Sequence, residues 1–285
     1  MTLSEFISAA TRALEAVGIE SGRLEAELLL CTALGVDRKK LFLETKSQLS
    51  AADLARANEL LELRKTRFPL QYIMGTIEFL GLSFSVKPGV FIPRPETETL
   101  VEEARKILGG LESPAILEIG TGSGVVVVTL AVLFPGATVY ATDVSPLAIA
   151  VGSENAGRHG VAGRVSFLLR DVRSPAGNES RECSVDMIVS NPPYIPGPEI
   201  PFLEPEVSKY EPREAQDGGL DGLDLVRAIA GRSRDFLKPG GWLLLEIGAG
   251  QAESAAGIVA SAGLASVRIV KDLAGRDRVL VAMKE

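Results

Sequence analysis

The sequence predicts an α/β chain in which a small N-terminal helical bundle precedes a parallel, doubly wound sheet. In residues 1–66, apolar residues recur at helical spacing with little strand signal. Further along, short and dense apolar runs are typical of strands that are buried on both faces. Helical segments separate these runs, which indicates parallel strands that bind ligands at their carboxyl ends. The runs are Ala115 to Ile119, Thr138 to Ala141, Val165 to Leu169, Val185 to Val189 and Trp242 to Ile247.

The N-terminal bundle is expected to form a domain of its own over residues 1–71. Helical spacing is found in residues 3–17 and again in residues 24–34, after a Ser-Gly break. Ser50, with Asp53 three residues later, resembles a capping box and predicts the start of a third long helix. Two roles stay open for this bundle: it can stabilise its neighbour, or it can dock a partner.

A β-hairpin is expected to link the bundle to the α/β domain over residues 72–90. Apolar residues alternate on both sides of Gly81, as paired strands around a tight turn require. Two prolines, Pro93 and Pro95, then stiffen an extended approach and let a helix start near Pro95. The α/β domain is expected over residues 91–285.

The last two strands are expected near residues 265–270 and 278–283. The loop between them contains Gly275 and is too short for a crossover helix. They should therefore pair antiparallel at the edge of the sheet.

Composition excludes several classes of protein. Of the 285 residues, 46% are apolar and 24% are charged, which is typical of a soluble globular chain. No apolar run reaches the roughly 18 residues that span a bilayer. The N-terminal segment fits neither a secretory signal nor a transit peptide. We expect a cytoplasmic protein without membrane association, and a monomer.

The cysteines and the histidine do not indicate chemistry. Cys31 and Cys183 are the only cysteines and lie in no CxxC or Cys/His cluster, so neither a disulfide framework nor a metal site is expected. Both are interpreted as small buried hydrophobic residues. The single histidine, His159, follows a predicted helix and is expected at the surface or at a helix end.

The charge distribution argues against stable nucleic-acid binding. The net charge is −7, and residues 1–70 contain as many basic as acidic residues, so the acidic excess lies entirely after them. A protein that holds duplex nucleic acid through its phosphates usually carries the opposite sign.

A glycine-rich turn predicts a nucleotide-like cofactor. The first sheet strand leads into Gly120-Thr121-Gly122-Ser123-Gly124 and then into an apolar helix. Glycines let the backbone turn sharply and approach a ligand closely. Asp143 ends the second strand, nineteen residues beyond Gly124, where a carboxylate can accept hydrogen bonds from both ribose hydroxyls. As an alternative, Asp143 caps the helix that begins near Pro146.

Both NAD and S-adenosylmethionine fit these features, and two observations favour the second. The turn is GxGxG instead of the GxGxxG of the dinucleotide fingerprint. Glu118, two residues before the first glycine, can face the cationic end of the cofactor. At the end of the third strand, Asp171 is a candidate acceptor for the adenine amino group and Val172 a candidate to pack on the ring.

The fourth strand runs into the most informative stretch of the chain, Asn191-Pro192-Pro193-Tyr194. Consecutive prolines hold the main chain rigid and leave its carbonyls outward. An asparagine oxygen and a proline carbonyl can then both accept from one planar NH2 group, on which Tyr194 can stack. Such a site suits a poor nitrogen nucleophile that must be oriented towards a methyl donor without a strong general base. A proline turn without chemistry is the alternative.

Several segments together carry a resemblance to a known family. They are Pro69 to Gly75, Phe91 to Glu98, Gly120 to Gly124, Asp143 to Pro146, Asn191 to Tyr194, Tyr210 to Arg213, Gly218 to Asp224 and Asp272 to Arg278. On these segments the chain resembles the release factor glutamine methyltransferases, called PrmC or HemK. Asn-Pro-Pro-Tyr alone is shared with adenine amino-methyltransferases of DNA, whereas Phe91 to Glu98 and Asp272 to Arg278 are narrower.

The resemblance implies a class I (Rossmann-like) methyltransferase fold with an antiparallel edge strand. It also implies methyl transfer from S-adenosylmethionine to the glutamine of the Gly-Gly-Gln motif in peptide chain release factors, a step linked to translation termination, with S-adenosylhomocysteine as product. The helical domain would help to hold the factor. Residues 120–124, Asp143 and Asn191 would bind the cofactor, residues 191–194 would hold the glutamine amide, and Phe91 would form an aromatic wall. Some family members have an aromatic residue at the position of Val172, so the affinity for adenine is in question.

Three rival functions are considered. An adenine amino-methyltransferase acting on nucleic acid would need a basic surface, which the acidic excess argues against. A non-enzymatic binding protein with a vestigial pocket conflicts with the intact Asn-Pro-Pro-Tyr. An NAD-dependent dehydrogenase lacks the longer glycine fingerprint.

Overall fold

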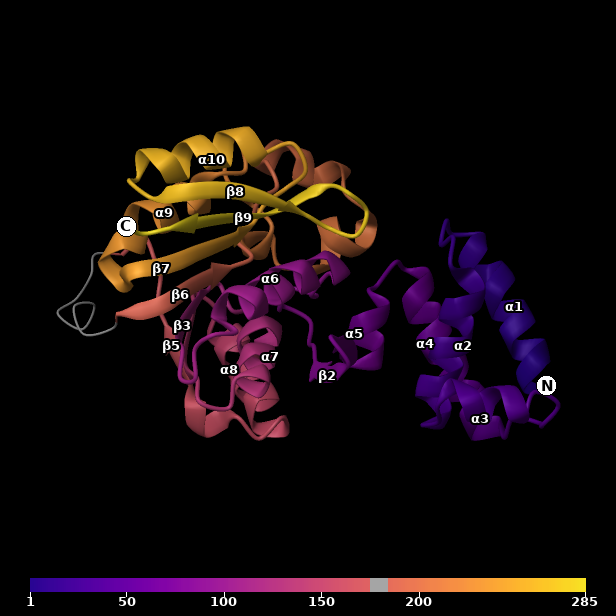
Figure 1. Ribbon diagram of the computed structural model, residues 1–285. Coiled ribbons are helices and arrows are strands. Elements are labelled where there is room, and N and C mark those ends of the chain that lie inside the picture. Colours follow the sequence, from indigo (N-terminus) through magenta and orange to yellow (C-terminus); the bar gives the residue numbers. More distant parts are fainter. Residues whose placement is uncertain (175–183) are drawn as a thin grey trace. The chain divides into compact units, whose positions relative to one another are not determined.

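The computed structural model describes residues 1–174 and 184–285. These residues divide into two compact units, which we call the helical unit and the sheet unit (Figure 1). The helical unit comprises Met1–Thr76 together with Glu204–Tyr210, and the sheet unit comprises Ile77–Leu203 together with Glu211–Glu285. Residues 204–210 thus fold with the N-terminal helices, which no feature of the sequence indicates.

The helical unit is built from short helices. They are α1 (Leu3–Glu15), α2 (Gly22–Leu34), α3 (Arg38–Leu43), α4 (Ala51–Lys65), α5 (Leu70–Met74) and the π-helical turn η5 (Glu206–Tyr210). The predicted start of α4 is confirmed, because the Ser50 hydroxyl accepts a 3.1 Å hydrogen bond from the Asp53 amide. Helices α3 and α5 were not predicted, since five or six residues are too few to show a helical period.

A buried arginine joins residues 204–210 to the rest of the helical unit. Arg64 is 4% exposed, and it donates from Nε to Glu25 at 2.6 Å and from Nη1 to Glu206 at 2.7 Å. Arg67 donates to the same Glu206 from Nε at 2.7 Å. The Tyr210 hydroxyl donates to the Thr66 carbonyl at 2.9 Å. Charged hydrogen bonds therefore hold this segment at the end of α4.

The predicted hairpin is present as β1 (Thr76–Phe79) and β2 (Leu82–Ser85). Leu80 and Gly81 form its turn with φ of 46° and 75°, as a tight hairpin requires. The hairpin begins at Thr76 and not at Tyr72, because Tyr72 lies in α5.

Within the described residues, seven strands form one sheet in the order β5-β4-β3-β6-β7-β9-β8. Strands β3 to β7 pair in parallel, and β9 runs antiparallel to both of its neighbours. The predicted mixed sheet is confirmed, with the reversed strand between β7 and the edge strand β8. The strands are β3 (Ala115–Ile119), β4 (Thr138–Asp143), β5 (Val165–Leu169), β6 (Val185–Ser190), β7 (Leu237–Glu246), β8 (Ala265–Lys271) and β9 (Asp277–Met283).

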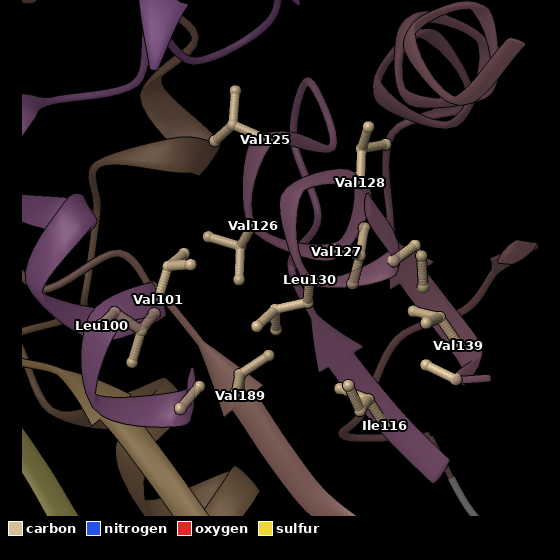
Figure 2. Packing of buried hydrophobic residues seen from close by; sticks show 14 of the residues in the cluster. Leu100, Val101, Ile116, Val125, Val126, Val127, Val128, Leu130, Val139 and Val189 are labelled. Carbon is tan, nitrogen blue, oxygen red and sulfur yellow. The ribbon is translucent and has the colours of Figure 1, made fainter. Parts of the chain in front are cut away.

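Helices cover both faces of this sheet. On one face, α6 (Glu98–Leu108), α7 (Val125–Leu133) and α8 (Pro146–Arg158) bury an apolar cluster that includes Val126, Leu130 and Val189, shown in Figure 2. On the other face, α9 (Asp224–Phe236) and α10 (Ala252–Ser261) cover a second cluster around Ile188 and Leu245. Neighbouring residues of one strand thus face different clusters, which explains the dense apolar runs.

The turn between β8 and β9 is organised by Asp272. Its Oδ1 accepts from the amides of Ala274 and Arg276, both at 3.0 Å, and its Oδ2 accepts from Arg278 at 3.2 Å. Arg278 is buried and also donates to the Ile247 carbonyl at 3.2 Å, just beyond the end of β7. The family-like segment Asp272 to Arg278 therefore fixes the end of β7.

Other expectations concern single residues. Cys31 is buried, as predicted, whereas Cys183 lies outside the described residues. His159 follows α8, where its Nε2 lies 2.9 Å from the Ser83 carbonyl, so the expected helix-end position is confirmed. Among the described residues, no helix combines the length and the apolar character needed to cross a bilayer.

Candidate active site

The carboxyl ends of β3, β4 and β6 are tied together. The Ser190 hydroxyl, at the end of β6, donates to the Ile119 carbonyl, at the end of β3, at 2.6 Å. The Gly120 amide donates to the Thr142 carbonyl of β4 at 2.8 Å. The glycine-rich turn and Asn191 therefore follow two residues that are hydrogen-bonded to each other, on one edge of the sheet.

Backbone conformation and the space around the turn explain its three glycines. Gly120, Gly122 and Gly124 have φ of 74°, 54° and 79°, a region that favours glycine. A Cβ at Gly120 or Gly122 would meet no heavy atom within 4 Å, which leaves open space beside the turn. A Cβ at Gly124 would lie 3.0 Å from the Cα of Gly152, so this glycine lets α7 approach α8.

The two polar residues of the turn are held from inside the protein. The Thr121 hydroxyl donates to Glu118 at 2.5 Å, and the Ser123 carbonyl accepts from the Asn155 side chain at 2.8 Å. Glu118 is 2% exposed, and burial, reinforced by the charge of Asp143, raises its pKa well above the ordinary value. The Glu118 carboxyl thus braces the turn from within.

Asp143 lies at the end of β4 and orients the same turn. Its Oδ2 accepts from the Gly122 amide at 2.8 Å, and its Oδ1 accepts from the Ser145 amide at 2.9 Å. The hydroxyl of Ser145, not Asp143, caps α8 by accepting from the Ala148 amide. The alternative of Asp143 as the helix cap is therefore wrong, and its carboxylate is fixed beside the turn.

Asp171 lies next to Asp143, because the Arg170 amide donates to the Asp143 carbonyl at 2.8 Å. The carboxylate of Asp171 is already paired, since it accepts from the Arg173 side chain at 2.8 Å, and these hydrogen bonds lower its pKa. Val172 is half-buried and packs on the cluster beneath α9. Both cofactor candidates of the third strand thus have protein partners.

The tetrapeptide Asn191 to Tyr194 is held at both ends. The Asn191 side-chain nitrogen donates to the Thr97 hydroxyl at 3.1 Å, and the Tyr194 carbonyl accepts from the Gln251 side chain at 2.9 Å. Within residues 1–174 and 184–285, the Asn191 side-chain oxygen makes no hydrogen bond. The amide of Asn191 is thus oriented with its acceptor side open.

The two prolines of the tetrapeptide, Pro192 and Pro193, are fixed by close packing. Pro192 is buried. A Cβ at Gly218 would lie 2.7 Å from the Pro193 carbonyl, so only glycine permits this approach. The segment Gly218 to Asp224, one of the family-like motifs, therefore packs against the tetrapeptide.

Phe91 is positioned by a charged pair. The Arg94 guanidinium lies 5.0 Å from the centre of the Phe91 ring and is hydrogen-bonded to Glu211. Glu211 also accepts from the Ile92 amide at 3.3 Å, and burial raises its pKa. The family-like segments around Phe91 and around Glu211 thus meet in one network.

The sequence predicts no role for two residues of the site, Thr97 and Glu246. Thr97 ends the short 3-10 helix η1 (Pro95–Thr97) before α6 and orients Asn191. Glu246 ends β7 and is 0% exposed, and burial raises its pKa to about 7. Burial and the charge of Glu246 raise the pKa of Tyr194 to about 12. An acid closing a buried apolar strand was the available signal for Glu246.

Family models match both parts of the chain. Residues 5–75 match the model described as the PrmC N-terminal domain, and residues 82–201 match the methyltransferase small domain. A release factor glutamine methyltransferase of Geobacter sulfurreducens is 45% identical over 263 residues, which cover 92% of this chain and 90% of that protein. One of Moorella thermoacetica is 41% identical and covers 100% of this chain and 99% of that protein.

Solved structures share the fold. A methyltransferase from Pyrococcus furiosus has a TM-score of 0.51 and 19% identity, covering 72% of this chain and 90% of that chain. The T. thermophilus 16S rRNA methyltransferase, solved with AdoMet and guanosine, has a TM-score of 0.54 and 21% identity. It covers 74% of this chain and 50% of that chain. At these identities the likeness concerns the fold alone.

Proposed function

This chain belongs to the release factor glutamine methyltransferases, and from that membership we propose that it methylates a peptide chain release factor. The acceptor is the side-chain amide nitrogen of the glutamine in the Gly-Gly-Gln motif. The donor is S-adenosylmethionine, and the product S-adenosylhomocysteine. The hydrogen bond between Ser190 and Ile119 carries the proposal. The tetrapeptide follows Ser190 and the glycine-rich turn follows Ile119, so both segments begin at neighbouring points of one sheet edge.

The proposed cofactor residues are 120–124, Asp143, Asp171, Val172 and Asn191. The residues present fit such a group, since the turn has open space at Gly120 and Gly122 and the Asp143 carboxylate is fixed beside it. Each carboxylate oxygen of Asp143 accepts one hydrogen bond from a backbone amide and keeps a lone pair for a ribose hydroxyl. When bound, the cofactor supplies a methyl group on a sulfonium ion.

The proposed substrate residues act by orientation. The open oxygen of Asn191 and the Pro192 carbonyl accept the two N–H bonds of the glutamine amide, while Tyr194 stacks on its plane and Phe91 forms a wall. An amide nitrogen is a poor nucleophile because its lone pair is delocalised, so fixing its direction lowers the barrier. The methylated nitrogen is acidic and loses its proton readily, so no strong base has to act before transfer.

Transfer of a labelled methyl group from S-adenosylmethionine to a release factor tests the glutamine assignment. The wild-type chain should label a release factor and should not label its Gln→Ala variant, whereas Asn191→Ala should lose transfer while it keeps the wild-type unfolding temperature. Equal labelling of both factors refutes the glutamine assignment. Label in DNA or RNA adenine instead of the factor favours the nucleic-acid alternative.

We also propose that residues 1–71 hold the factor, that residues 72–90 link the parts and that residues 91–285 transfer the methyl group. Support comes from the separate apolar core of the helical unit and from the two matched family models. A short Gly-Gly-Gln peptide should then be methylated with a higher KM than the whole factor. The expected setting is the cytoplasm, where release factors act, with the chain as a monomer.

A further inference from the structure

Glu246 is a buried carboxyl group that the proposed mechanism does not use. It ends β7 and is fully buried. Within the part of the chain that the structure describes, neither of its oxygens has a hydrogen-bond partner. Burying a carboxyl in this way is costly, and charging it there costs more. A group of this kind in a folded protein calls for a functional explanation.

Glu246 faces the same side of the sheet as Asn191. Val189 of β6 and Leu244 of β7 are partners in register, and both belong to the apolar cluster beneath α6 and α7. Side chains alternate along a strand, so Glu246, two residues after Leu244, faces that side too. Asn191, two residues after Val189, lies on that side as well. Its side chain donates a hydrogen bond to Thr97, the residue directly before α6.

The groups that act on Glu246 come from three segments. The hydroxyls of Thr97 from η1 and Tyr194 from the tetrapeptide lie close enough to favour its charged form, as does Arg278 from β9. Glu96 from η1 disfavours the charged form, as burial does, and burial outweighs the three favourable groups. Thr97 is the residue that orients Asn191. Glu246 thus acts with Tyr194 directly, and with Asn191 through Thr97.

We propose that Glu246 is a positioning residue for the methyl transfer, whose ionised carboxyl accepts hydrogen bonds from the hydroxyls of Thr97 and Tyr194. The Thr97 oxygen then presents its lone pair to the Asn191 amide, and the Tyr194 ring is held against the substrate. In neutral Glu246 one oxygen carries a proton and becomes a donor, so only the other oxygen remains a strong acceptor for the two hydroxyls. This inference rests on the proposed function, since it assigns a residue to the same site.

The decisive variant is Glu246→Gln, assayed at saturating cofactor and factor between pH 6 and 9. The wild-type kcat should rise with pH through about 7 as Glu246 ionises. The variant should have a kcat about 10 to 100 times lower, as small misplacements of reacting groups produce, with little change in KM and no pH dependence in this range. A wild-type kcat, or a wild-type pH profile in the variant, overturns the proposal.

Two further variants separate positioning from folding. Glu103→Gln removes another buried carboxylate of the sheet unit, one paired with Arg268 and Lys106, and should keep the wild-type kcat and pH profile. Thr97→Val removes the hydroxyl between Glu246 and Asn191. Its effect on kcat should not add to that of Glu246→Gln, because both break one chain of contacts. Additive effects overturn the proposal.

A readout without release factor keeps this test independent of the proposed function. The side-chain amide signals of Asn191, assigned by their loss in Asn191→Asp, should shift in NMR spectra with an apparent pKa near 7 in the wild type. They should not shift in Glu246→Gln. If the wild type labels no factor but shows this shift, the proposed function fails and the positioning role stands. If the signals do not move with pH, the positioning role fails.

Discussion

The Asn191 side-chain amide donates its hydrogen bond to the hydroxyl of Thr97, which lies 94 residues earlier in the chain. Thr97 belongs to the family-like segment that precedes the first sheet strand, and Asn191 to the tetrapeptide after the fourth. This one contact fixes which side of the Asn191 amide is available to accept. It also joins the two motifs directly.

Thr97→Val should reduce kcat by about 10 to 100 times, because Asn191 loses the acceptor that sets its orientation. Thr97→Ser keeps the hydroxyl and should stay within a few-fold of the wild type. Steady-state transfer to the release factor at saturating cofactor measures both. If valine is as active as serine, another contact orients Asn191.

Asp143→Asn should weaken cofactor binding by about 10 to 100 times, since a charged hydrogen bond contributes about 1.5 to 3 kcal/mol. An asparagine cannot accept with both side-chain atoms, so the Gly122 or the Ser145 amide loses its partner. Titration calorimetry with S-adenosylmethionine measures the change. Asp277→Asn, which removes an exposed pair with Lys271, is the control and should bind normally. An unchanged Kd in Asp143→Asn contradicts the assigned role.

Glu246→Gln should make the protein more stable at high pH. The carboxyl has its pKa raised from 4.5 to about 7 in the fold, so the folded state retains a proton that the unfolded state releases. Its contribution to stability is complete below pH 4.5 and is lost as pH rises through about 7, a loss of roughly 3 kcal/mol. Gln carries no such charge.

Denaturant unfolding at pH 8 and at pH 5 checks this stability effect. The variant should exceed the wild type at pH 8, and the difference should shrink towards pH 5. Reduced stability of Glu246→Gln at both values would mean that the carboxyl supports the fold. Greater stability with lower activity is the pattern of a residue retained for function.

Arg64→Met should destabilise the helical unit by about 3 to 5 kcal/mol, because Glu25 then keeps a buried charge without a cation and Glu206 keeps only Arg67. Arg23→Met provides the matched control, since Arg23 is largely exposed and pairs with Glu27, and should change stability by less than about 1 kcal/mol. Chemical unfolding followed by circular dichroism measures both. Equal effects of the two substitutions contradict a special role for Arg64.

The local features of the fold followed from the sequence because they depend on neighbouring residues. Apolar runs between helices predicted β3 to β7, since a strand buried on both faces must be apolar throughout. The Ser50 cap and the turn at Gly81 depend on residues within one helical turn or one hairpin. The tetrapeptide and the glycine-rich turn were likewise visible as motifs.

The sequence by itself determined the order of the elements, the motifs and the kind of chemistry that their residues allow. Only the tertiary structure decided which distant residues meet: Thr97 with Asn191, Glu206 with Arg64, and Glu246 with the tetrapeptide. No local period or spacing encodes such contacts, because they arise when strands far apart in the chain become neighbours in one sheet. Burial is also a property of the whole fold, so the raised pKa of Glu246 could not be read from an isolated acid at the end of a strand.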